Sequence, residues 1–95
     1  MVVDDDAVSR VALIDLMQKM GFSDVLEFED GVAAWEYLEQ NPLPVLCCCD
    51  VRMPKMSGIQ LLQKIRLDQK IKTLTTVINE PEQFLLILIY YFYLV

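Results

Sequence analysis

The chain has 95 residues and a formal net charge of −6, from 14 acidic and 8 basic side chains. This length is enough for one domain with a single core, and the lack of a basic cluster argues against direct nucleic-acid binding. Histidine is absent, which excludes acid/base catalysis and metal ligation by imidazole. No signal peptide is recognised at the amino terminus, where an apolar strand leads directly into an acidic cluster, so we expect a cytoplasmic protein.

Residues 1–3 are apolar and predict a short first strand, which Asp4, Asp5 and Asp6 follow. Strands commonly have ~5 residues, so either this strand begins upstream or half of it is lost. Asp6 is a suitable N-cap for the next helix, because its carboxylate can accept a hydrogen bond from a free backbone N–H. Gly21 stands where that helix is expected to end. Apolar residues at helical spacing predict its buried face: Leu13, Leu16, Met17 and Met20.

A second strand is predicted at residues 25–28, and Asp30 with Gly31 predicts the turn into a second helix that ends at Gln40. The two prolines within residues 41–44 stop this helix, because proline disfavours helix at its own position and at the one before it. The side chains expected to face the sheet are Ala34, Trp35 and Leu38.

A third strand is predicted at residues 45–49, which lack the polar alternation of a half-exposed strand and therefore indicate burial on both faces. Ser57 is a plausible N-cap for a third helix, and residues 67–72 are interpreted as a polar connection. The buried side of the third helix is expected to carry Leu61, Leu62 and Ile65.

Three consecutive cysteines lie in the third predicted strand. Neighbouring side chains on a strand point to opposite faces, so this run suits neither a disulfide framework nor the C-x-x-C spacing of a zinc site. We interpret the cysteines as small apolar residues that fill a buried strand.

Asp50 ends the third strand as Asp4 and Asp5 end the first. Alternating strands and helices predict a parallel sheet, whose ligands bind at the carboxyl ends of the strands. If the two strands are neighbours, the three carboxylates share one pocket, where two charges ~4 Å apart repel by ~4 kcal/mol at an effective dielectric of 20. A proton or a hard cation, Mg²⁺ or Mn²⁺, would relieve this repulsion. Acids at strand ends also serve as helix caps, which is our interpretation of Asp6.

Three segments together resemble the receiver domain of two-component response regulators: VVDDD near the amino terminus, FEDG at residues 28–31, and DVRMPKMSG at residues 50–58. The resemblance extends from residue 1 to about residue 66. It implies a flavodoxin-like, doubly wound α/β fold with a parallel sheet in strand order 2-1-3-4-5, incomplete at both ends in this chain. We expect one receiver-like domain over residues 1–95, with residues 1–79 following the family and residues 80–95 forming an atypical apolar tail.

The resemblance implies that Asp50 is the phosphoacceptor, modified by a histidine kinase or a phosphotransfer protein. Asp5 and Asp50 would ligate Mg²⁺ or Mn²⁺ together with the backbone carbonyl of Arg52, and Asp4 would assist through a water molecule. Such a domain is at most a self-phosphorylating phosphoacceptor and not a conventional turnover enzyme.

Two positions depart from the pattern of active family members, which carry Ser or Thr at the end of the fourth strand and Lys at the end of the fifth. The fourth strand is predicted at residues 75–79, with Asn79-Glu80-Pro81 where the hydroxyl residue is expected, and no Lys or Arg follows Lys72. Two functions therefore remain: a phosphoacceptor receiver, and a degenerate receiver that acts as a phosphorylation-independent protein-interaction module.

Residues 84–95 are apolar or aromatic throughout and carry no charge. A bilayer span needs ~20 apolar residues, so we do not expect this segment to cross a membrane. It is interpreted as one or two buried strands at the sheet edge, as a segment shared with a second copy in a homodimer, or as an end altered by truncation or a shifted reading frame.

Overall fold

The computed structural model describes residues 1–79. The apolar segment predicted to form an edge strand or a dimer contact, residues 84–95, lies outside the described residues, and so does any fifth strand. The described elements are β1 (Val2–Val3), α1 (Ala7–Lys19), β2 (Glu27–Phe28), α2 (Gly31–Gln40), β3 (Cys47–Asp50), α3 (Gly58–Leu67) and β4 (Thr76–Asn79).

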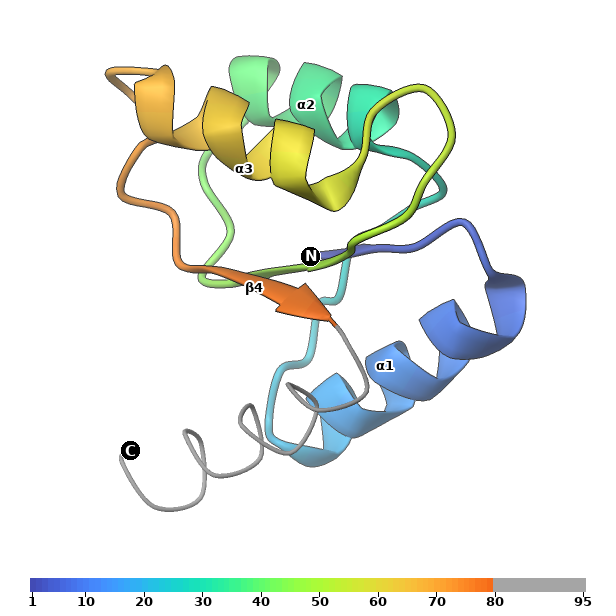
Figure 1. Ribbon diagram of the computed structural model, residues 1–95. Helices are drawn as coiled ribbons and strands as arrows, with labels where there is room; N and C mark the ends of the chain where they lie inside the picture. Colours follow the sequence, from blue (N-terminus) through green and yellow to red (C-terminus); the bar gives the residue numbers. More distant parts are fainter. Residues whose placement is uncertain (80–95) are drawn as a thin grey trace.

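The four described strands form one parallel sheet in the order β2-β1-β3-β4. Helices α2 and α3 cover one face of this sheet and α1 covers the other (Figure 1). The predicted flavodoxin-like α/β fold and the adjacency of the first and third strands are confirmed. None of the helices in the described part of the chain has the length and apolarity needed to cross a bilayer.

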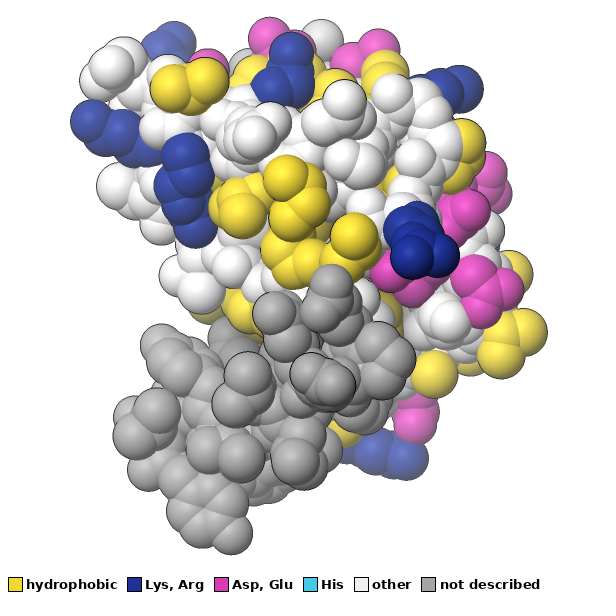
Figure 2. Space-filling model, in the orientation of Figure 1, with side chains coloured by type: hydrophobic (Ala, Val, Ile, Leu, Met, Phe, Trp, Pro, Cys, Tyr) yellow, Lys and Arg dark blue, Asp and Glu magenta, His cyan; other side chains and the backbone are white. Residues whose placement is uncertain are grey.

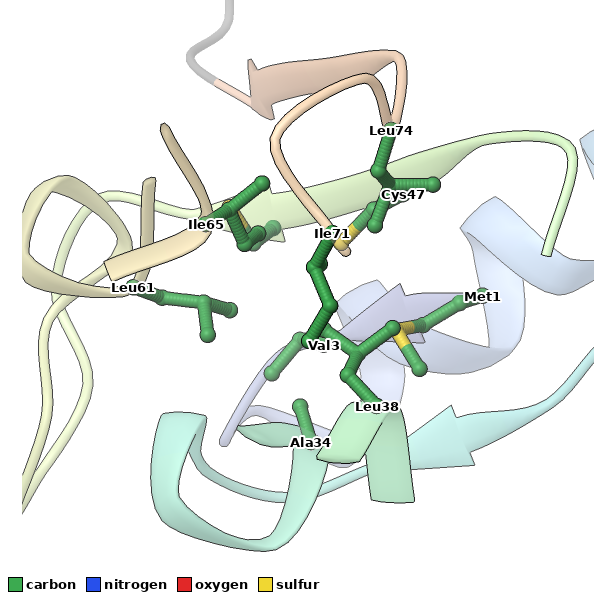
Figure 3. Packing of buried hydrophobic residues seen from close by; sticks show 10 residues of the cluster. Met1, Val3, Ala34, Leu38, Cys47, Leu61, Ile65, Ile71 and Leu74 are labelled. Carbon is green, nitrogen blue, oxygen red and sulfur yellow. The ribbon is translucent and has the colours of Figure 1, made fainter. Parts of the chain in front are cut away.

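The larger part of the core lies between the sheet and the helices α2 and α3. Figure 3 shows side chains from both helices converging on Val3 of β1, with Leu38 from α2 and Ile65 from α3. Ile71 and Leu74 also belong to this cluster, although each lies between α3 and β4. The predicted polar connection at residues 67–72 is therefore wrong in part, because this segment folds back over the sheet and buries Ile71.

The smaller part of the core lies under α1 and includes Val2, Leu13, Met17, Leu46 and Cys48. Side chains alternate along β3, so Cys48 packs here while its two cysteine neighbours pack on the α2 and α3 side. All three thiols are free and fully buried, as predicted. Burial raises the pKa of the Cys48 thiol to about 12, so this thiol stays protonated at neutral pH.

Helix ends follow the local signals in the sequence. Asp6 and Asp30 accept hydrogen bonds from the backbone N–H groups of the first turns of α1 and α2. Ser57 and Gln60 form a reciprocal capping box at the start of α3. Gly21 has a φ of 104° and closes α1 by donating its N–H to the carbonyl of Gln18, as expected for a glycine just past a helix.

Two strands are shorter at their amino ends than the apolar runs suggested. The prediction of a strand over residues 45–49 is wrong at its start, because β3 begins at Cys47 and Val45 is 76% exposed. The neighbouring strands offer partners only from Thr76 and Val2 onward, so nothing pairs with Val45. Strand β2 likewise contains only Glu27–Phe28, the two residues that β1 can pair with.

Some residues of the predicted helix faces are only half-buried. Leu16 and Leu62 are intermediate in exposure, whereas Leu61 and Ile65 are fully buried. Trp35 packs against the core but also holds the ammonium group of Lys64 5.1 Å from the centre of its ring. The indole therefore lies between α2 and α3 as well as toward the sheet.

Candidate functional site

The carboxyl ends of β1 and β3 bring three acidic side chains together. Asp4 and Asp5 follow β1 directly, Asp50 ends β3, and one carboxylate oxygen from each lies within 4.8 Å of the others. Acidic side chains gather on the right-hand side of the molecule in Figure 2, the side toward which β4 points in Figure 1. The cluster of carboxylates expected from the two strand endings is therefore formed.

Asp4 is the most buried member of the cluster, with 2% of its surface exposed. Its Oδ1 accepts a hydrogen bond from the Asp6 N–H at 2.9 Å, while the Arg10 guanidinium binds the Asp4 backbone carbonyl and not its carboxylate. Burial raises the pKa of Asp4, and the nearby carboxylate of Asp50 adds to this effect. The negative charge at this position thus costs stability when nothing compensates it.

Asp50 is half-buried, and Asp5 is exposed. The Oδ1 of Asp50 accepts a hydrogen bond from the Val51 N–H at 2.9 Å, which holds the carboxylate at the carboxyl end of β3. Within residues 1–79, the carboxylates of these two residues and of Asp4 make no ion pair with Lys or Arg. The cluster therefore presents net negative charge to any approaching ligand.

Two glycines fix the loop that joins β3 to α3. A Cβ atom at Gly58 would overlap the backbone carbonyl oxygen of Asp50, and the Gly58 N–H donates to the carbonyl of Val51 at 3.0 Å. A Cβ atom at Gly31 would come within 2.8 Å of the carbonyl oxygen of Met56. Both positions need glycine because backbone from the loop approaches them closely, so this loop is seated against the starts of α2 and α3.

The basic side chains of the loop lie outside the acidic cluster. Lys55 has a left-handed φ of 67°, and its Nζ lies 3.8 Å from the Oδ2 of Asp30, the N-cap of α2. The Arg52 side chain is exposed. Arg52 and Asp5 line the same surface hollow of about 560 Å³, together with Val51, Met53, Pro54, Ser57 and Ile59.

The donor set suits a hard divalent cation. Three carboxylates with oxygens within 4.8 Å of one another offer oxygen ligands only, because no histidine exists in the chain and the described thiols are buried in the core. Mg²⁺ and Mn²⁺ prefer such ligands, whereas zinc favours sulfur and imidazole. The residues present therefore fit an Mg²⁺ or Mn²⁺ ion.

Comparisons with known proteins agree on one family. The model of the response regulator receiver domain matches residues 1–85. Chemotaxis protein CheY1 of Helicobacter pylori is 36% identical over 82 residues, which cover 86% of this chain and 66% of that protein. A chemotaxis protein CheY homolog of Campylobacter jejuni is 33% identical over 82 residues, covering 86% of this chain and 63% of its own length. The chain belongs to the response regulator receiver domain family.

The same architecture occurs in the crystal structure of a response regulator receiver protein from Pseudomonas putida. The two chains superpose with a TM-score of 0.71 at 26% identity, over 96% of this chain and 76% of the other. The matched segment spans slightly less than two thirds of the chemotaxis relatives named above.

The structure thus gathers three of the four predicted site residues, Asp4, Asp5 and Asp50, and puts Arg52 in the hollow beside them. In the sequence, Gly58 stands out only as the last residue of the DVRMPKMSG segment, and Asn79 only as part of a departure from the family. In the structure Asn79 is the in-register neighbour of Asp50. Knowing the register of β4 against β3 would have identified Asn79 as a neighbour of Asp50.

Proposed function

We propose that this receiver domain is the phosphoacceptor of a two-component phosphorelay in the cytoplasm, modified on Asp50 by a histidine kinase or a phosphotransfer protein. The observation that carries this proposal is the position of the Asp50 carboxylate at the end of β3, with oxygens of Asp4 and Asp5 within 4.8 Å. The relatives named above, described as chemotaxis proteins, support a signalling role of the same general kind.

The chemistry is a transfer of one phosphoryl group to a carboxylate. The Val51 N–H occupies Oδ1 of Asp50, which leaves Oδ2 as the nucleophile with no hydrogen-bond donor among residues 1–79. An oxygen–phosphorus bond forms as the phosphorus–nitrogen bond of the donor phosphohistidine breaks. The electron pair of that bond stays on the imidazole nitrogen, which then takes a proton from solvent. The product is an acyl phosphate on Asp50.

Asp5, Asp50 and the backbone carbonyl of Arg52 would hold Mg²⁺ or Mn²⁺, with Asp4 acting through a bound water. Such an ion offsets the negative charge of the transferring phosphoryl group. The Val51 N–H orients the Asp50 carboxylate. The close approach of Gly58 to the Asp50 backbone fixes the position of the loop between β3 and α3. Positioning of reactants accounts for most of the protein's part in phosphoryl transfer.

The described basic side chains leave the phosphoryl group without an ammonium partner. Lys55 lies beside Asp30, and no Lys or Arg follows Lys72 in the sequence. Charge-assisted hydrogen bonds are roughly twice as strong as neutral ones, so their loss weakens the hold on the phosphoryl oxygens. We therefore expect a low yield of modified protein or a short-lived adduct.

This missing cation, together with Asn79 in place of a hydroxyl, favours a second function. A degenerate receiver would keep the fold and the acidic pocket and act as a phosphorylation-independent protein-interaction module. In that case the chain binds its partner equally well with and without a phosphodonor.

The decisive experiment is intact-mass measurement of the whole chain after incubation with acetyl phosphate and Mg²⁺. We expect a mass increase of one phosphoryl group that is absent from Asp50→Asn and retained in Asp24→Asn, an exposed acid that lines a hollow beside Leu46, before the start of β3. Labelling of equal strength in Asp50→Asn would refute the assignment. No labelling of a chain that still binds Mg²⁺ would favour the interaction module.

A further inference from the structure

Asn79 lies beside Asp50 at the functional edge of the sheet. The two residues end β4 and β3 and are paired in register in parallel strands, which run ~4.8 Å apart. Val77 and Cys48, two positions earlier on the same strands, both pack in the core under α1. Because side chains alternate along a strand, Asn79 and Asp50 project to this same side of the sheet.

The carboxamide of Asn79 is incompletely satisfied. Its Oδ1 is buried and accepts no hydrogen bond from any residue in the described part of the chain. A buried acceptor without a donor is rare in folded proteins, and an ion or a water molecule is a common reason for one. The neighbouring Asp50 cannot supply the donor when it is ionised, because a carboxylate only accepts hydrogen bonds.

Strand β3 has two neighbours, and both are followed by or end in residues with side-chain oxygens at the same edge of the sheet as Asp50. Strand β1 leads into Asp4 and Asp5 on one side, and β4 ends in Asn79 on the other. A positive ion with its bound waters is a donor and an electrostatic partner for all of these oxygens. Amide oxygens belong to the ligand class that Mg²⁺ and Mn²⁺ accept.

We propose that Asn79 contributes a neutral oxygen to the divalent-cation site of Asp5 and Asp50, with Oδ1 facing the ion or one of its waters. This inference rests on the proposed function, because it assumes that the acidic cluster binds a cation. It assigns the carboxamide a positive role at the position where the chain lacks a hydroxyl. Asn79 then helps to position the metal ion, and is more than a position where the family's hydroxyl residue has been lost.

The test is titration of the whole chain with Mn²⁺, with the free ion measured by electron paramagnetic resonance. We expect Asn79→Leu to weaken Mn²⁺ binding about 10-fold, the lower range for loss of an outer-shell partner. Asn41→Leu makes the same chemical change at the C-cap of α2 and is expected to leave the affinity unchanged. In the absence of the ion, Asn79→Leu should melt at the same or a higher temperature, because it removes an unpaired buried acceptor.

A second variant keeps the test decisive if Asn79→Leu does not fold. Asn79→Asp adds a charge at the same atom and should tighten Mn²⁺ binding even in about 0.3 M KCl, where the Debye length is roughly 6 Å. Unchanged affinity in both Asn79 variants, with Mn²⁺ binding lost in Asp50→Asn, would overturn this inference and leave the proposed function standing. Absence of Mn²⁺ binding by the unsubstituted chain would overturn the cation site and this inference with it.

Discussion

The two ends of the sheet differ in how they are stabilised. At the carboxyl ends of the strands, the oxygens of Asp4, Asp5 and Asp50 lie within 4.8 Å of one another without an ion pair in residues 1–79. At the amino ends, Leu46 is 3% exposed and lines an apolar hollow of about 330 Å³. The other side chains around this hollow include Met1, Met17, Phe22, Val25, Leu26 and Tyr37.

Residues that stabilise the fold and residues of the candidate site therefore lie only a few positions apart in the chain. Only the three cysteines of β3 separate Leu46, which contributes apolar burial, from Asp50, which belongs to a cluster of like charges. Burial of apolar surface stabilises the fold unconditionally, whereas gathered carboxylates destabilise it until a cation binds. Neutralising a carboxylate at one end and truncating an apolar side chain at the other should therefore change stability in opposite directions, and only the acidic end should respond to metal.

The largest effect is expected at Gly58, which lies against the backbone of Asp50 and Val51 at the carboxyl end of β3. Gly58→Ala would force a methyl group into the carbonyl of Asp50, so we expect the free energy of unfolding to fall by more than about 4 kcal/mol. Urea denaturation followed by circular dichroism measures this. Gly21→Ala is the control, since its Cβ meets nothing within 4 Å and only its positive φ is strained. A smaller loss at Gly58 than at Gly21 would contradict the close approach.

The next effect concerns the apolar end. Leu46→Ala should lower the free energy of unfolding by about 2–5 kcal/mol, because it removes buried methyl groups and leaves a cavity. Val45→Ala is the matched neighbour and should change stability by less than about 0.5 kcal/mol, because Val45 is largely exposed. Equal losses at the two positions would mean that the strand continues through Val45 after all.

Metal should act only on the acidic end. Mg²⁺ at about 100 times its Kd should raise the free energy of unfolding by about 2.7 kcal/mol, because it binds the assembled carboxylates and not the unfolded chain. Asp5→Asn should abolish this increment, and Leu46→Ala should retain it in full. Thermal unfolding with Mg²⁺ and with chelator provides the measurement. Identical melting temperatures in the two conditions would show that the cluster binds no Mg²⁺.

The smallest effect is expected from neutralising Asp4 in the absence of metal. Its folded-state pKa is raised by burial, so between the unfolded value of ~3.9 and the folded value the native state binds more protons. The stability contribution of this group therefore falls as pH rises through that window and stays low at neutral pH. Asp4→Asn should melt slightly higher than the unsubstituted chain at pH 7, with the difference shrinking toward pH 4. A lower melting temperature at pH 7 would show that the charge is stabilising.

The sequence by itself determined the helix ends and the identity of the acids. Asp6 and Ser57 cap their helices as predicted, and Asp30, predicted only to turn the chain into the second helix, caps it as well. A cap depends on one side chain and the N–H groups a few residues further along. The family resemblance supplied the strand order, and with it the expectation that Asp5 and Asp50 meet. These features depend on short segments of chain, or on a pattern that relatives share.

Only the tertiary structure decided which apolar residues reach the core and what surrounds Asp50. Val45 is exposed because no strand pairs with it, and Ile71 is buried because its segment folds back over the sheet. The Gly58 backbone closely approaches the carbonyl of Asp50, and Asn79 pairs in register with Asp50. Both contacts form between different elements of the fold. Such contacts depend on how whole elements pack, so no local pattern of residue types encodes them.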